Sequence, residues 1–156
     1  MNLWLNDLTE TYAKEICHWK YDGEYSIYNF PDWNKVLSEK WAIANDKKRE
    51  MEFSTVVDDN RRLCGYFRLI DKDDYVLIGL GLKPSLCGQG LGNAFMELIM
   101  QKCANMYPNK KLVLEVRDFN KRAAKCYEKA GFKATDIYKK DTPMGSSEFL
   151  RMEFNY

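Results

Sequence analysis

The run Tyr75 to Leu82, YVLIGLGL, constrains the fold more than any other stretch because it is apolar on both faces. A strand of this kind is covered on both sides, so we expect it in the middle of a sheet. Lys111 to Val116, KLVLEV, predicts a second buried strand. Between the two runs the spacing predicts an amphipathic helix with one apolar stripe, made of Leu91, Phe95, Leu98, Ile99, Cys103 and Met106.

The remaining segments predict a mixed sheet with helices against it, in one α/β domain over residues 1–156. Thr9 is the predicted cap of a first helix, and Trp33 to Asn45 is predicted as a second. Residues 120–130 are predicted as a short helix that stops at Gly131. Further strands are expected at 2–5, 52–57, 63–70, 132–138 and 148–154, with loops at 21–31 and 139–147.

Composition limits the classes of partner. The formal net charge is +1, which gives no reason to expect nucleic acid as a partner, because nucleic-acid-binding domains usually carry a basic patch or stripe. A total near zero is still compatible with a local basic patch. The five cysteines contain no C-x-x-C pair, and His18 is the single histidine, so the sequence predicts no zinc site and no other metal site. We therefore expect neither nucleic acid nor metal as a partner.

The cysteines and the amino-terminal segment indicate where in the cell the protein is expected. An odd number of widely spaced cysteines suits a reducing environment, where thiols act as small core residues. The amino terminus, MNLWLNDLTE, lacks the pattern of a signal peptide, and no apolar run approaches the roughly 20 residues of a membrane span. The expected location is the cytoplasm, with no membrane partner.

The hexapeptide Cys87-Gly88-Gln89-Gly90-Leu91-Gly92 follows the first apolar run and precedes the predicted helix. It is not a Walker loop, and the dinucleotide pattern G-x-G-x-x-G fails because its third glycine would fall on Asn93. Glycines here would still turn the backbone tightly and present N–H groups at a helix start, where an anion is favoured. The hexapeptide alone fits a phosphate cradle and a turn without a ligand about equally well.

A second constellation lies in the predicted helix after the second apolar run. Asn120 and Tyr127 are seven residues apart, about two helical turns, so they share a face, with Ala123 and Ala124 between them. This face suits a close-fitting ligand that needs a hydrogen bond at each end. The alternative is a tyrosine packed on the core, with its hydroxyl satisfied there.

Together the two constellations resemble the GCN5-related N-acetyltransferase (GNAT) family, from about Tyr75 to Phe132. The acetyl-CoA loop of that family, Gln/Arg-x-x-Gly-x-Gly/Ala, falls on the hexapeptide 87–92, with Cys87 in place of Gln or Arg. The later segment of the family, N-x-x-A-x-x-x-Y-x-x-x-G-F, falls with every spacing kept on Asn120, Ala123, Tyr127, Gly131 and Phe132.

The resemblance implies a mixed, mostly antiparallel sheet in which residues 78–82 and 111–116 form a splayed parallel pair that takes acetyl-CoA. It also implies that the backbone of Leu80, Gly81 and Leu82 pairs with the pantetheine arm and holds the thioester carbonyl. Asn120 would bond the same arm. The pyrophosphate would lie on Cys87, Gly88, Gln89, Gly90, Leu91 and Gly92. A reactive cysteine at Cys87 is an alternative, since a helix start lowers the pKa of a thiol, and a small loop residue without reactivity is the simpler interpretation.

The chemistry implied is acetyl transfer to an amine by direct attack on the thioester. Tyr127 would protonate the leaving sulfur. Glu115 lies in a segment similar to that of ribosomal-protein alanine acetyltransferases, where a glutamate at this place is the base. The alternative for Glu115 is a structural salt bridge, and Glu24 is a second candidate base.

The acceptor is expected to be a primary amine of a small molecule or peptide, and Glu24 and Tyr25 in the aromatic stretch YDGEYSIYNF are candidates to contact it. The chain would act as a monomer or homodimer. One rival hypothesis is a catalytically inactive CoA-binding sensor or regulatory domain, favoured by Cys87. Another is a nucleotide-phosphate-binding module, which leaves the face of Asn120 and Tyr127 unexplained.

Overall fold

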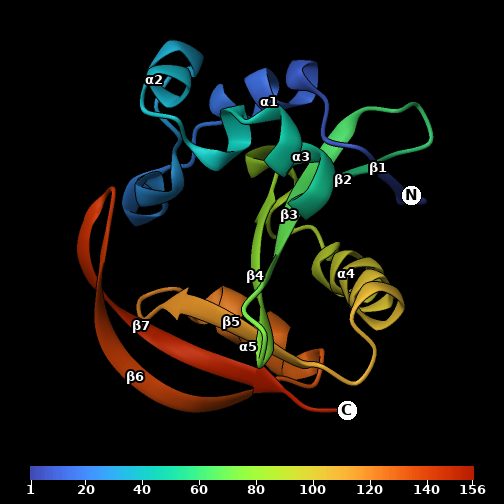
Figure 1. The fold of residues 1–156 in the computed structure, drawn as a ribbon, viewed down its shortest axis with the longest axis vertical. Coiled ribbons are helices and arrows are strands. Elements are labelled where there is room, and N and C mark those ends of the chain that lie inside the picture. The colour runs from blue at the N-terminus through green and yellow to red at the C-terminus, as the bar shows by residue number, and fades with distance from the viewer. The chain divides into compact units, whose positions relative to one another are not determined.

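The computed structural model describes all 156 residues, and its strands form one seven-stranded sheet (Figure 1). The order across the sheet is β1 (Trp4–Asn6), β2 (Phe53–Val57), β3 (Leu63–Asp71), β4 (Tyr75–Leu82), β5 (Lys111–Arg117), β7 (Gly145–Phe154) and β6 (Lys133–Thr142). Strands β4 and β5 run parallel, while the β1–β2, β2–β3, β5–β7 and β6–β7 pairs are antiparallel. The predicted mixed, mostly antiparallel sheet with one parallel pair is confirmed.

The chain forms two compact units. The first unit contains residues 1–68 and 80–89, and the second contains residues 69–79 and 90–156. Strands β3 (Leu63–Asp71) and β4 (Tyr75–Leu82) each contribute to both units.

The first unit combines an antiparallel part of the sheet with short helices. Its strands besides β3 and β4 are β1 (Trp4–Asn6) and β2 (Phe53–Val57). Its helices are α1 (Glu10–Cys17), α2 (Trp33–Ser38) and α3 (Asp46–Glu52), with the short 3₁₀ helices η1 (Gly23–Tyr28), η2 (Ala42–Ala44) and η3 (Pro84–Leu86). The stretch predicted as a structured loop at 21–31 therefore contains η1.

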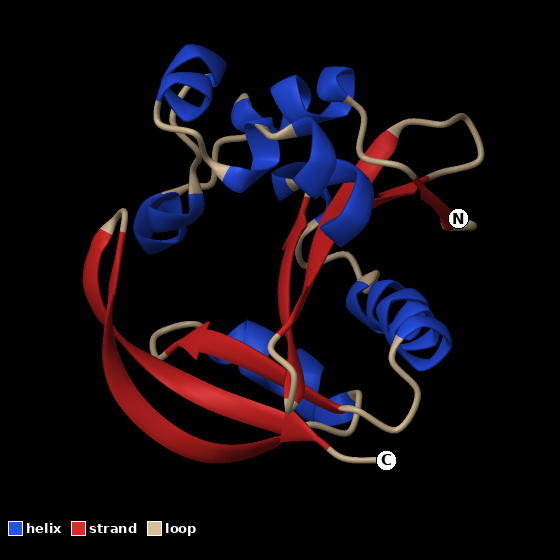
Figure 2. Ribbon diagram, viewed as in Figure 1, coloured by secondary structure: helices blue, strands red, loops and turns tan.

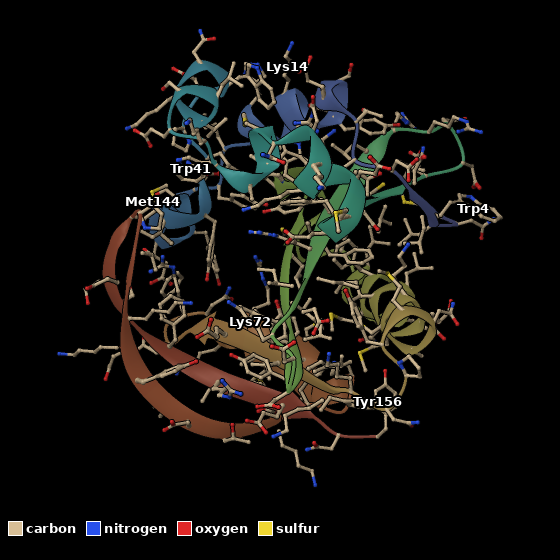
Figure 3. The ribbon with its side chains drawn as sticks, in the orientation of Figure 1. Trp4, Lys14, Trp41, Lys72, Met144 and Tyr156 are labelled. Atoms are coloured by element: carbon tan, nitrogen blue, oxygen red, sulfur yellow. The ribbon has the colours of Figure 1, made fainter.

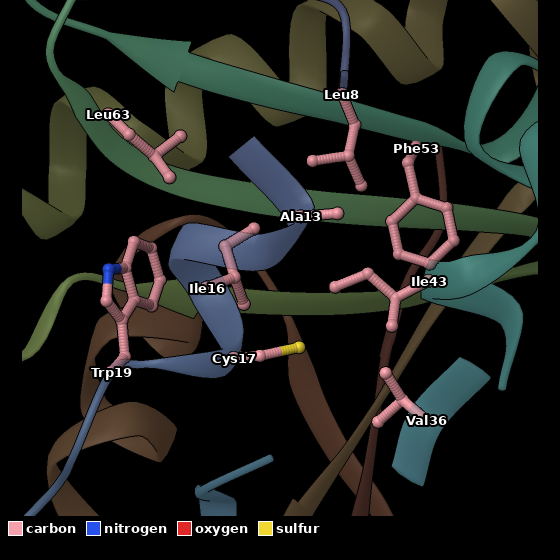
Figure 4. Packing of buried hydrophobic residues seen from close by; sticks show 9 residues of the cluster. All are labelled: Leu8, Ala13, Ile16, Cys17, Trp19, Val36, Ile43, Phe53 and Leu63. Carbon is pink, nitrogen blue, oxygen red and sulfur yellow. The ribbon is translucent and has the colours of Figure 1, made fainter. Parts of the chain in front are cut away.

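Helix α1 anchors the core of this unit. The Thr9 side chain accepts a hydrogen bond from the backbone N–H of Tyr12, as the sequence predicts for an N-cap. Helical spacing then directs Ala13, Ile16 and Cys17 inward. Figure 4 shows this core, whose buried members are Leu8, Ala13, Ile16, Cys17, Trp19, Val36, Ile43, Phe53 and Leu63.

The prediction of one helix from Trp33 to Asn45 is wrong. Helix α2 ends at Ser38, and Lys40 takes a left-handed backbone conformation (φ 59°) that no helix can continue. On α2, Val36 is buried, whereas its neighbour Leu37 is 50% exposed. The sequence prediction also missed α3, whose residues DKKREME carry almost no apolar periodicity and whose start is capped by the Asn45 side chain.

The second unit consists of α4 (Gly92–Met106), β5 (Lys111–Arg117), α5 (Lys121–Lys129), β6 (Lys133–Thr142) and β7 (Gly145–Phe154), together with its parts of β3 and β4. One face of its sheet is apolar, because Leu112 lies opposite Phe154 and Leu114 opposite Met152. Phe132, directly after α5, packs on this face, with its ring centroid 5.6 Å from that of Phe154. The other face carries charged side chains.

The segment predicted as a loop at 139–147 is mostly strand. Strand β6 continues to Thr142 and β7 begins at Gly145, so that a tight turn joins two long strands, as Figure 2 shows. Met144 lies at this turn (Figure 3), and Gly145 follows it with φ 104°. The left-handed glycine and the cross-strand ladder from Lys133 to Thr142 explain the longer hairpin.

The cysteines are all free thiols, and three are deeply buried: Cys17, Cys64 and Cys103. Burial raises the pKa of Cys17 to about 11 and that of Cys103 to about 12, so these thiols act as core residues. None of the helices, of which α4 is the longest, has the length and apolarity that crossing a bilayer requires.

Ile16→Ala is expected to lower the free energy of unfolding by about 2–5 kcal/mol, because it leaves a cavity at a fully packed site. Chemical denaturation monitored by circular dichroism measures the loss. Leu37→Ala, a truncation at a half-exposed position of the same unit, is the control and should cost well under half as much. Equal losses would contradict the packing described here.

Candidate active site

The glycine loop adopts the conformation that its glycines allow. Gly88 and Gly90 both have left-handed backbone angles, with φ 76° and 78°. Helix α4 begins directly afterwards, and its N-cap, Leu91, has no side chain that can bond the first N–H groups. An uncapped helix start presents several backbone donors and the positive end of the helix dipole, which together favour an anion.

The glycines of the loop differ in what a side chain would meet. A Cβ at Gly90 would touch nothing within 4 Å, so this position is open apart from its backbone angle. A Cβ at Gly92 would lie 2.9 Å from Sγ of Cys126 on α5, so Gly92 permits two helices to approach closely. Gln89 is held by its side-chain nitrogen, which donates to the Ser85 carbonyl at 3.0 Å.

Cys87 is a partly buried hydrogen-bond donor. Its Sγ lies 3.6 Å from the Lys83 carbonyl oxygen and 3.8 Å from the Leu82 carbonyl oxygen. A thiol in this arrangement ties the start of the loop to the end of β4, which is a structural role for the residue that departs from the pattern of the family.

The parallel ladder between β4 and β5 is short. It joins Tyr75 to Lys111 and continues to Ile78 and Leu114, whereas β4 itself extends to Leu82. The predicted splayed pair is consistent with this early end of the ladder. Backbone groups of Leu80 and Leu82 on that edge of β4 therefore need partners other than β5.

Within the first unit, the end of β4 is surrounded by tyrosines. A Cβ at Gly81 would lie 2.6 Å from the Tyr66 ring, so glycine is required where this ring covers the strand. The Tyr21 hydroxyl donates to the Leu82 carbonyl at 2.7 Å. Sequence reasoning missed both tyrosines, because these contacts join residues far apart in the chain.

Asn120 and Tyr127 lie on α5 in the second unit. Asn120 is the N-cap of the helix, and its Oδ1 accepts from the backbone N–H of Ala123 at 3.1 Å. This capping role was not part of the sequence prediction, although asparagine is a strong N-cap. Tyr127 is 9% exposed, and its ring centroid is 6.4 Å from that of Phe132.

Glu115 lies on the charged face of β5. Its carboxylate accepts hydrogen bonds from the Tyr138 hydroxyl and, at 2.7 Å, from Nζ of Lys140. Burial alone would raise the pKa of Glu115, but these two hydrogen bonds and the charges of Lys140 and Arg151 together lower it. Burial and the bond to Glu115 raise the pKa of Tyr138 to about 12, so this phenol remains the donor.

The partners of Glu115 were missed because the prediction placed Lys140 in a loop. The signal available was the i, i+2 spacing of Tyr138 and Lys140, which puts both on one face of a strand. The structural salt bridge that the sequence left open for Glu115 is therefore present.

The predicted site residues fall into two groups. The first unit contains Leu80, Gly81, Leu82, Cys87, Gly88, Gln89, Glu24 and Tyr25, whereas the second contains Gly90, Leu91, Gly92, Glu115, Asn120 and Tyr127. Glu24 is exposed on η1 and Tyr25 beside it is partly buried. The structure contains no cluster of three or more His, Cys, Asp or Glu side chains arranged to hold a metal ion.

Residues 9–132 match the model of the acetyltransferase (GNAT) family. The chain belongs to this family. The match covers most of the chain and includes both predicted constellations, so the family and the predicted acetyl-CoA-dependent acyltransferase class are confirmed. A comparison with curated protein sequences finds no match.

Solved structures show where else this fold occurs. A chimera of spermidine N-acetyltransferase SpeG from Vibrio cholerae and hSSAT is 17% identical, with a TM-score of 0.79 over 99% of this chain and 96% of that chain. The spermidine N-acetyltransferase from Vibrio cholerae in complex with CoA and spermine is 16% identical, with a TM-score of 0.78 over 98% and 95%. The ribosomal-protein-S18-alanine N-acetyltransferase from Escherichia coli is 18% identical, with a TM-score of 0.68 over 99% and 94%. At these identities the likeness establishes the fold.

Lys140→Met is expected to raise the pKa of Glu115, because the burial remains while the cation and its hydrogen bond are lost. In the parent protein the lowered pKa means that ionised Glu115 stabilises the fold at neutral pH. This contribution is lost as the pH falls through the pKa of the folded state. An NMR titration of the glutamate side-chain carboxyl carbons measures the change.

Lys139→Met is the matched control, because it removes the same charge from the adjacent residue of β6, whose side chain points to the opposite face. If both variants moved the Glu115 titration equally, the direct pairing with Lys140 would be refuted.

Proposed function

We propose that the protein is an acetyl-CoA-dependent N-acetyltransferase that transfers an acetyl group to a primary amine of a small molecule or peptide by direct attack on the thioester. The observation that carries this proposal is the uncapped start of α4 after two left-handed glycines. Backbone donors without a side-chain cap suit the pyrophosphate of CoA and need no basic side chain, which accommodates Cys87.

Different segments of the chain would bind different parts of acetyl-CoA. Cys87 to Gly92 would hold the pyrophosphate, and the free backbone edge at the end of β4 would pair with the amides of the pantetheine arm. Asn120 would bond the same arm while its Oδ1 caps α5. Bound acetyl-CoA would supply the activated acyl group.

Tyr127 is the proposed general acid. It is a buried phenol at the end of a helix face whose other members are small alanines. Phenol and thiol have similar reference pKa values, about 10 and about 8.5, so a proton passes readily from this hydroxyl to a leaving thiolate.

Glu115 is the proposed base, and its surroundings limit how it acts. Because its pKa is lowered, Glu115 is ionised at neutral pH, as a base must be, but it binds a proton weakly. Its oxygens already accept from Tyr138 and Lys140, so a proton from the amine would arrive through a water molecule. Glu24, exposed on η1, is the alternative base and, with Tyr25, the proposed contact of the acceptor amine.

The acceptor class rests on general chemistry and on the family. Spermidine and a ribosomal-protein alanine, the acceptors named for the similar structures, are both amines, which supports an amine acceptor here. We propose further that residues 1–156 act as one N-acetyltransferase domain, as a monomer or homodimer. Five free thiols support a reducing compartment such as the cytoplasm.

A catalytically inactive CoA-binding sensor is the second candidate. Cys87, in place of the Gln or Arg of the family, favours it, and Tyr127 argues against it because a sensor has no need of a buried acid. Binding of acetyl-CoA without acetylation of any amine in a broad panel would favour the sensor.

Tyr127→Phe is expected to lower kcat by about 10²-fold, because only the donated proton is lost while the ring is kept. The affinity for acetyl-CoA, measured by calorimetry, should stay nearly intact. Tyr156→Phe, which removes a half-exposed phenol from the same unit, is the control. Normal turnover by Tyr127→Phe would remove Tyr127 from the role of acid.

Gly90→Asp is expected to weaken acetyl-CoA binding by about tenfold or more, because it places a carboxylate at the helix start where the pyrophosphate would lie. The site is open to a Cβ, and aspartate tolerates a left-handed backbone better than most residues. Calorimetric titration with acetyl-CoA, with ADP and NAD as comparison ligands, tests both the variant and the proposal itself.

Gly23→Asp is the matched control, since Gly23 also has a left-handed angle (φ 59°) and open space around its Cα but lies outside the loop. Unchanged affinity in folded Gly90→Asp would reject the cradle. The absence of acetyl-CoA binding in the parent protein would reject the proposed function.

A further inference from the structure

The carbonyl of Leu82, at the end of β4, faces away from β3. The next N–H, that of Lys83, donates to the Cys64 carbonyl on β3 at 2.8 Å. The chain has no cis peptide bond, and in a trans peptide the C=O and N–H point in opposite directions. The Leu82 oxygen is therefore on the open edge of β4, on the side where the ladder with β5 has ended.

Two side chains contact the Leu82 carbonyl oxygen. The Tyr21 hydroxyl donates to it at 2.7 Å, and the Cys87 thiol lies 3.8 Å away as a weaker donor. The thiol has one S–H and is slightly closer to the Lys83 carbonyl, at 3.6 Å, so the Tyr21 hydroxyl is the strong donor to the Leu82 oxygen. A ligand amide that approaches this edge meets an oxygen that is already hydrogen-bonded, and the other backbone groups of the edge are the better partners.

Tyr21 is itself rigidly held. Oδ1 of Asn29 accepts from the Tyr21 backbone N–H at 2.7 Å, and Nδ2 of Asn29 donates to the Tyr21 carbonyl at 3.5 Å. The Tyr21 ring meets the Tyr28 ring edge-on, with centroids 6.3 Å apart. Burial, with the nearby Tyr66 and Cys87, raises the pKa of Tyr21, so the phenol keeps its proton as a donor.

We propose that Tyr21 is a positioning residue for the pantetheine arm of acetyl-CoA. Because the Tyr21 hydroxyl is hydrogen-bonded to the Leu82 carbonyl, three backbone groups on the open edge of β4 remain to pair with the ligand. They are the Leu82 N–H and the N–H and C=O of Leu80. In extended backbone the two polar groups of one residue point to the same edge and neighbouring residues alternate, so those of Gly81 face β3. The inference rests on the proposed function and specifies which of the three predicted residues pair with the ligand.

The physical gain is preorganisation. Without the Tyr21 hydroxyl, the Leu82 carbonyl would keep only the weak contact with the Cys87 thiol. The last peptide of β4 would then be less restrained, and ligand binding would have to order it. The nucleotide part of CoA would be unaffected, because the glycine loop holds it through other groups. The inference therefore predicts a selective effect on ligands that carry the pantetheine arm.

The test compares Tyr21→Phe with the parent protein in calorimetric titrations of acetyl-CoA and of 3′-phospho-ADP, the nucleotide fragment of CoA. We expect acetyl-CoA to bind about three- to tenfold more weakly and 3′-phospho-ADP to bind unchanged, since one hydrogen bond is lost while the ring is kept. Tyr12→Phe is the matched control, because its hydroxyl also donates to a backbone carbonyl, that of Arg61 at 2.9 Å, outside β4.

Tighter binding of acetyl-CoA by Tyr21→Phe would overturn the inference, since Tyr21 would then compete with the ligand for Leu82. Unchanged binding, or equal weakening of both ligands, would overturn it as well. If Tyr21→Phe did not fold, Asn29→Ala, which frees Tyr21 but keeps the phenol, should give the same selective loss, and its absence would count against the inference. Failure of the parent protein to bind acetyl-CoA would instead reject the proposed function.

Discussion

The need to satisfy backbone hydrogen bonds along β4 governs this structure. The parallel ladder with β5 ends at Ile78 and Leu114, yet β4 continues as an extended strand to Leu82. Polar groups on the freed edge cannot remain without partners. The Tyr21 hydroxyl donates to the Leu82 carbonyl, and Cys87 Sγ lies close to the same oxygen. The remaining backbone groups of that edge are the ones that we propose to pair with the pantetheine arm.

Local signals in the sequence specify most of the elements. Strand β4, the start of α1 at Thr9 and the end of α5 before Gly131 are all fixed by apolar runs, caps and glycines that act within a few residues. The prediction failed where a single backbone angle decided the outcome. Lys40 breaks the helical pattern, and the hairpin at Met144 lengthens two strands through cross-strand pairing that no local pattern reports.

In the candidate site, too, local sequence patterns could be predicted and contacts made by tertiary folding could not. The glycine loop and the face of Asn120 and Tyr127 could be predicted because each is contiguous in the sequence. Tyr21 is 61 residues from Leu82, and Tyr138 is 23 residues from Glu115, so those hydrogen bonds depend on tertiary folding. Motif reasoning therefore names the groups that we propose to contact the cofactor, and it missed Tyr21, Tyr138 and Lys140, which hydrogen-bond to Leu82 and Glu115.

The charges around Glu115, on the second unit, limit how strongly this residue could attract a cationic acceptor. Glu115 would attract a polyamine if it were an isolated anion, but Lys140 and Tyr138 already bind its two oxygens, and the charge of Arg151 acts on it too. A second ammonium group would have to displace Lys140, exchanging one cation for another with no net gain in charge pairing. Likeness in fold to spermidine acetyltransferases therefore carries no preference for polyamines at Glu115.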